Sequence, residues 1–159
     1  MSSSGREWEI KNNIMMIGEY QHKLDDKNRL AIPAKFRVDL KKGAVVTRGL
    51  DNCLTVYPLA EWQKLADKLA ALPISQGNSR AFARFLLSGA ADVSLDGNGR
   101  ILLPEFLKSF AHLNSKDKVI VIGMQNRLEI WSEKDWDVYR RQTEKDSIKI
   151  AEELENLNI

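Results

Sequence analysis

The chain has 159 residues, of which 43% are hydrophobic and 29% are charged, and its formal net charge is +2. This composition is typical of one ordinary folded domain. It includes no apolar run long enough to span a bilayer, and the charge excludes a polycation that binds nucleic acid through charge alone. The single cysteine, Cys53, excludes an internal disulfide and leaves no cysteine cluster for zinc.

The first repeat-sized unit is expected to follow a short leader. Residues 1–16 have neither the cationic start nor the apolar stretch of a secretory signal, so we expect a flexible leader and a cytoplasmic protein. Residues 17–24 alternate apolar and polar side chains as in a half-buried strand, and residues 25–28 supply turn chemistry. The other expected elements of this unit are a strand over 30–32, a short helix over 34–40 behind Pro33, and hairpin strands over 44–48 and 53–57.

Two helices and a second copy of this unit are expected next. The spacing of apolar residues predicts helices over 59–71 and 79–88. A long polar helix from Ser132 to about Leu157 is expected to end the chain. The expected organisation is therefore a leader over 1–16, repeat 1 over 17–60, connecting helices over 61–88, repeat 2 over 89–134 and a C-terminal polar helix or tail over 135–159.

The strongest signal in the chain is a motif that occurs twice, 71 positions apart. Asp25-x-x-x-Arg29 and Asp96-x-x-x-Arg100 are each followed by three apolar residues and a proline. The hairpins downstream are 74 positions apart, which fits an insertion near Asn114-Ser115-Lys116. A long period present only twice does not fit a solenoid, and units this small seldom fold alone. We therefore expect two pseudo-symmetric halves that share one core.

The two copies differ in charge. Residues 18–57 carry eight Lys and Arg against five Asp and Glu, whereas residues 89–131 carry five of each. An arginine on a tight, protruding turn can bond guanine O6 and N7 together, and lysines beside it can contact phosphates. The alternative is a purely structural turn, in which Asp25 bonds the backbone two residues on and Arg29 pairs with it.

Residues suited to catalysis or metal binding are scarce. His22 and His112 are the only histidines, and neither has the spacing of a metal site. The run Gly97-Asn98-Gly99 lacks the third glycine of a phosphate loop, because Leu102 stands in that place. We therefore expect no enzyme, no cofactor, no metal and no small-molecule substrate.

These residues resemble the MraZ family of bacterial transcriptional regulators, which are built of two AbrB-like (SpoVT/AbrB) repeats. The resemblance covers about residues 17–139 and is carried by the segments 18–22, 24–37, 47–51 and 89–92. It implies a mainly β fold with helices, a swapped-hairpin (double-split) β-barrel of two β-turn-β-α-β-turn-β halves. It also implies a ring-shaped homo-oligomer at the nucleoid, which binds short G-rich tandem repeats in double-stranded DNA upstream of the division and cell wall gene cluster, with repression as the expected effect.

Positions that match the family's motif receive its roles. Arg29 becomes the base-reading candidate and Lys27 its phosphate-contacting neighbour, while Arg100 is expected to matter less because the second copy is neutral. The candidates for DNA contact are Arg29, Lys27, Lys23, Lys35 and Arg100, and the turn-forming residues are Asp25, Asn28 and Asp96. Asn28 stands where the family usually has glycine, and it keeps the turn accessible because asparagine tolerates the left-handed conformation.

Two other functions remain open. AbrB-like barrels also serve as antitoxins whose extended tail binds a partner protein, and residues 146–159 could be such a tail. The tandem repeat and the helical insert between the copies argue against this reading. The other possibility is a ring-forming scaffold that binds no DNA.

Overall fold

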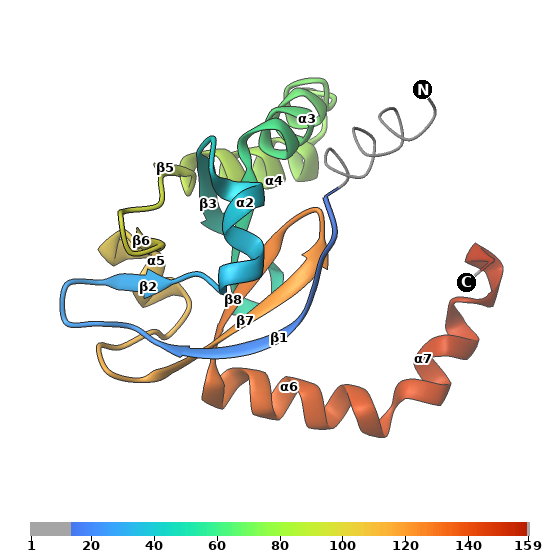
Figure 1. Cartoon of the computed structure of the whole chain (residues 1–159). Coiled ribbons are helices and arrows are strands. Elements are labelled where there is room, and N and C mark those ends of the chain that lie inside the picture. Colours follow the sequence, from blue (N-terminus) through green and yellow to red (C-terminus); the bar gives the residue numbers. More distant parts are fainter. Residues whose placement is uncertain (1–13, 159) are drawn as a thin grey trace, which may run out of the picture.

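The computed structural model describes residues 14–158, whose strands form two antiparallel sheets with helices around them (Figure 1). The strands are β1 (Met16–Lys23), β2 (Arg29–Ala31), β3 (Ala44–Arg48), β4 (Leu54–Pro58), β5 (Ala91–Val93), β6 (Arg100–Leu102), β7 (Lys118–Gln125) and β8 (Leu128–Ser132). The helices are α2 (Arg37–Leu40), α3 (Leu59–Ala70), α4 (Gly77–Ser88), α5 (Glu105–Phe110), α6 (Glu133–Lys145) and α7 (Ser147–Glu153), with 3₁₀ turns η1 (Ala34–Phe36), η2 (Leu50–Asn52) and η3 (Glu155–Leu157).

The larger sheet exchanges strands between the two repeats. Its order is β1-β7-β8-β4-β3-β5, so the hairpins β3–β4 and β7–β8 lie together at its centre. The first strand of each repeat pairs with the hairpin of the other repeat, β1 with β7 and β5 with β3. The second strands, β2 and β6, pair with each other in a separate two-stranded ribbon. Every strand pairing except those within the two hairpins therefore joins one repeat to the other.

The fold is mixed α/β with a large antiparallel sheet, and the exchange makes the two halves pseudo-symmetric. Within residues 14–158, however, β1 and β5 are the two edges of an open sheet, and no strand pair joins them. The expected swapped-hairpin barrel is therefore not confirmed. Most of the expected leader, residues 1–13, lies outside the described residues, whereas Met16 begins β1 and is fully buried.

The main hydrophobic core contains residues of both repeats. Leu30 and Ile101 form the central pair of the β2–β6 ribbon, and their exposed fractions are 0% and 1%. Burying a side chain of this size stabilises a fold by about 1.5–3 kcal/mol. Further members of the core are Leu24, Ile32, Phe36, Leu40, Leu103, Leu107, Leu128 and Ile130. Both repeats contribute to the core under the ribbon. This shared core therefore fixes the positions of the two loops that precede β2 and β6.

The C-terminal segment forms two helices instead of the single helix expected. Ser132 Oγ accepts a hydrogen bond from Asp135 N at 3.1 Å, which caps the start of α6. The side chain of Asp135 contacts His112, with Oδ2 2.6 Å from Nδ1. The helix is interrupted at Asp146, a residue type whose side chain competes with helical hydrogen bonds. Beyond this point α7 extends away from the sheet (Figure 1).

Candidate nucleic-acid interface

The first Asp-x-x-x-Arg motif forms a closed turn between β1 and β2. Asp25 Oδ1 accepts from the backbone N–H groups of Lys27 and Arg29 at 2.9 and 2.8 Å, and Oδ2 accepts from Arg29 Nε at 2.7 Å. These bonds, above all the one from the Arg29 N–H, hold the pKa of the Asp25 carboxyl below its usual value. Asn28 has a φ of 61°, the left-handed conformation that asparagine tolerates. The turn thus fixes the position of Nε in the Arg29 guanidinium.

The second motif forms the same turn before β6. Asp96 Oδ1 accepts from the backbone N–H groups of Asn98 and Arg100 at 2.8 and 3.0 Å, and Oδ2 accepts from Arg100 Nε at 2.9 Å. The pKa of Asp96 is likewise lowered, first by the Arg100 N–H. Gly99 holds the left-handed position with a φ of 73°. One motif therefore specifies one geometry in both copies.

The antiparallel β2–β6 ribbon places the two turns at its opposite ends, with Arg29 and Arg100 on the same face of the ribbon. Arg29 pairs with Leu102 and Arg100 with Ala31, one on each side of the central pair of the ribbon. Arg100 Nη1 lies 3.8 Å from Asp25 Oδ2, so an ion pair joins the two turns. The side chains of Arg29 and Arg100 are 32% and 26% exposed. Both guanidinium groups are therefore accessible, and Arg100 is engaged by two carboxylates.

Three lysines were predicted to accompany Arg29. Lys27 is exposed within the turn, and Lys23 is exposed at the end of β1. Lys35 is also exposed, but its Nζ lies 5.2 Å from the centroid of the Tyr20 ring in a cation–π contact. The structure therefore brings Lys23 and Lys27 to the first turn, while Lys35 extends over the aromatic ring of β1.

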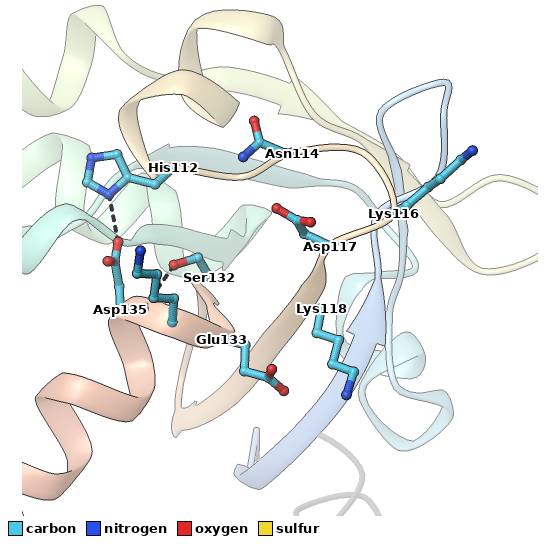
Figure 2. Close-up of a pocket in the computed structure, with 9 residues that line it drawn as sticks. His112, Asn114, Lys116, Asp117, Lys118, Ser132, Glu133 and Asp135 are labelled. Atoms are coloured by element: carbon cyan, nitrogen blue, oxygen red, sulfur yellow. Dashed lines mark hydrogen bonds and ion pairs between the residues drawn. The ribbon is translucent and has the colours of Figure 1, made fainter.

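Repeat 2 adds two lysines that are not among the residues predicted from sequence for this site. Lys116 N donates to Leu24 O at 2.8 Å, one residue before the turn begins, and Figure 2 shows the Lys116 side chain beside the β1–β2 loop. Lys118 is the strand partner of Lys23, although like charges opposite each other destabilise a sheet. The signal that could have found Lys116 is the insertion in the second copy, which lengthens this loop.

A hollow of about 680 Å³ lies between the Lys116 loop and the start of α6 (Figure 2). Charges of both signs line it, with Lys118 and Lys134 near Asp117 and Glu133, and the pair His112–Asp135 lies at one side. Within residues 14–158, no group of three or more His, Cys, Asp or Glu side chains is placed to hold a metal ion. Among the same residues, no helix has the length and apolar character needed to cross a membrane.

Comparison with known proteins agrees with the repeat structure. A family model described as "MraZ protein, putative antitoxin-like" matches the chain twice, over residues 15–85 and 86–158, and each match holds one of the two turns. Proteins named transcriptional regulator MraZ from Natranaerobius thermophilus, Caldanaerobacter subterraneus and Desulfitobacterium hafniense are 49%, 47% and 50% identical to it over 145 residues, covering 91% of this chain and 100% of each relative. By both its tandem match and these relatives, the chain belongs to the MraZ family.

Proposed function

We propose that this protein is a DNA-binding transcriptional regulator and that Arg29 is its main base-reading residue. The observation that carries the proposal is the pair of equal turns, one at each end of the β2–β6 ribbon, each presenting an accessible guanidinium. Because Asp25 holds Nε of Arg29, both Nη groups stay available for a bidentate contact with O6 and N7 of guanine. The name of the relatives, transcriptional regulator, supports the same function.

Arg100 takes the same role with a smaller contribution. Its Nε is held by Asp96 as that of Arg29 is by Asp25, so the fork has the same orientation within its turn. Its Nη1 also faces Asp25, and a carboxylate so near competes with a base edge for that donor. Arg100 therefore adds discrimination at a second base pair, but less than Arg29 does.

Lysines around the first turn supply affinity without sequence preference. Lys27 and Lys23 are exposed there, Lys35 lies farther along repeat 1, and Lys116 enters from repeat 2. Each phosphate that such a group neutralises releases counterions and adds about 0.9 to the slope of log affinity against log salt concentration. These contacts position the protein on the duplex, while the arginines read it.

The unit that binds DNA is a ring of subunits in this proposal. One pair of turns makes too few contacts for specific binding, but linked copies multiply weak sites through effective concentration. Apolar side chains that stay exposed in the single chain, such as Val38, Ile74 and Phe106, are available for contacts between subunits. A ring would match tandem operators, and the family resemblance implies G-rich repeats upstream of the division and cell wall genes, with repression at the nucleoid.

Fluorescence anisotropy tests this function directly. Wild type and Arg29→Ala are titrated onto duplexes that carry either G-rich repeats or scrambled repeats, after both proteins are shown to melt alike. Preference of the wild type for the repeats, lost in the folded variant, supports base reading by Arg29. If neither protein distinguishes the duplexes, the turn is structural and the regulator proposal fails.

A second candidate is a protein-binding module of the antitoxin type. It is favoured by the exposed apolar side chains of α6 and α7, where Val138 and Ile148 are 69% and 76% exposed. Truncation after Arg140 separates the two candidates. Loss of a bound partner protein with unchanged DNA binding favours the module, whereas a ring that persists without any DNA preference favours a scaffold.

A further inference from the structure

Each Asp-x-x-x-Arg turn is held by a basic side chain from the opposite repeat. In the first turn this residue is Lys108 of α5, whose Nζ donates to Asn28 Oδ1 at 2.5 Å. Asn28 Nδ2 in turn donates to Glu105 Oε2 at 3.0 Å. Lys108 is only 7% exposed, so its charge depends on these partners instead of water. Both ends of the Asn28 amide are therefore fixed by α5.

In the second turn Arg37 occupies the equivalent place. Arg37 and Lys108 are separated by the same 71 positions as the two motifs. Arg37 Nε donates to Ile32 O at 2.9 Å, and its guanidinium packs against Gly99. A Cβ atom on Gly99 would overlap this guanidinium, so no side chain fits there while Arg37 keeps its position. The longer side chain, Arg37, is thus combined with Gly99, and the shorter one, Lys108, is combined with Asn28.

Main-chain hydrogen bonds also join each turn to the opposite repeat. Leu103 N of repeat 2 donates to Asn28 O at 2.8 Å, and Ile32 N of repeat 1 donates to Gly99 O at 2.9 Å. Asn28 and Gly99 each precede the arginine that faces outward, and each has a positive φ. The residue that sets the direction of each arginine is therefore held, through main chain and side chain, by the other repeat.

We propose that Lys108 and Arg37 are positioning residues, which set the direction of Arg29 and Arg100 through Asn28 and Gly99. The combinations Asn28–Lys108 and Gly99–Arg37 fill the same space in two ways. A combination can therefore be exchanged as a whole, while exchanging one member leaves either an overlap or an ammonium without its amide acceptor, which for Lys108 leaves only the ion pair with Glu105 at 3.6 Å. The effect on DNA rests on the function proposed above, but the coupling itself can be measured without DNA.

The test on DNA uses Asn28→Gly, Lys108→Arg and the double variant, which rebuilds the Gly99–Arg37 combination in the first turn. We expect each single variant to lower the preference for G-rich over scrambled repeats about fivefold to tenfold, which is within the range of one typical lost hydrogen bond. The double variant should return to within about twofold of wild type. Because Lys108 holds a turn and contacts no phosphate in this proposal, the salt dependence should stay unchanged in all three.

Hydrogen exchange of the free protein measures the coupling without DNA. The amide of Arg29 donates to Asp25, so a peptide that covers residues 25–31 should exchange faster in both single variants and at the wild-type rate in the double variant. If wild type does not distinguish the duplexes but this pattern is seen, the regulator function fails and the coupling stands. Single effects that simply add in the double variant, or singles that change neither exchange nor preference, overturn the proposal.

The second turn provides the reciprocal test. Gly99→Asn with Arg37→Lys rebuilds the Asn28–Lys108 combination, so the double variant should restore the exchange of residues 96–102 that either single variant accelerates. Lys68→Ala, which removes an exposed lysine of α3, is the matched control and should change neither peptide. A double variant at the second turn that exchanges faster than both of its singles would contradict the proposal.

Discussion

Replacing Arg29 with lysine separates reading of bases from attraction to phosphates. Arg29 Nε is held by Asp25 at 2.7 Å while the rest of a 32% exposed side chain faces outward. Lysine keeps the positive charge, but its single ammonium can pair with Asp25 or reach a base edge and cannot form a planar fork. We therefore expect Arg29→Lys to bind scrambled duplex as wild type does and to lose the preference for G-rich repeats.

The magnitude follows from the contact that is lost. A good bidentate contact contributes roughly 1–3 kcal/mol of discrimination, so the ratio of the two dissociation constants should fall by about 5- to 150-fold. Arg100→Lys should lose less, because Arg100 Nη1 already faces Asp25. Anisotropy titrations on both duplexes at several salt concentrations give the ratio and the salt slope together.

Two results would refute this reasoning. If Arg29→Lys keeps the full preference, the turn contributes charge alone and the fork is irrelevant. If its affinity falls equally on both duplexes, Arg29 is a phosphate contact. Thermal melting of both proteins is the control, because the lysine variant must keep the turn folded for either result to be read.

Three further predictions concern charge, pH and the thiol. Lys116→Gly should reduce the slope of log affinity against log salt concentration by about 0.9, with equal effect on both duplexes. It should not lower the melting temperature, since Lys116 has a φ of 68° that glycine adopts without strain. An unchanged slope would show that Lys116 does not belong to the site. The pKa values of Asp25 and Asp96 lie below their usual 3.8, so their stabilisation is complete above that pH and is lost as the pH falls through the lowered pKa values. The difference in melting temperature between wild type and Asp25→Asn should therefore stay constant from pH 7 to about pH 5 and shrink below about pH 4, and a difference that grows on acidification would contradict the assignment. Burial raises the pKa of Cys53 to about 12, so iodoacetamide at pH 8 should label the unfolded protein and leave the folded protein unmodified, which mass spectrometry would show.

The local geometry of the turns could be predicted from sequence because it depends on neighbouring residues. An aspartate whose side chain bonds the backbone two and four residues on needs no distant partner, and both copies show these bonds. The strand over 44–48 and the helix starting at Leu59 were likewise predicted from local pattern and proline position.

Strand pairings and side-chain contacts between the two repeats could not be predicted in this way. Alternation shows which face of a strand is buried but not which strand lies beside it, so the pairing of β1 with β7 gave no local signal. For the same reason, helical spacing does not show that Phe82 and Phe106 are 41% and 48% exposed in the single chain. Lys108 and Lys116 were missed because their partners Asn28 and Leu24 lie far away in the sequence.

The strand exchange also determines when this chain can fold during its synthesis. Among residues 14–158, strand β1 has β7 as its one neighbour in the sheet, and Lys23 is paired with Lys118, which the ribosome adds much later. At about 5–20 residues per second, repeat 1 would wait several seconds with an unpaired strand and an open core. Contacts so distant in sequence also slow folding, because the loop must close before they form. The nascent first repeat is therefore the stage at which this protein most needs protection from aggregation.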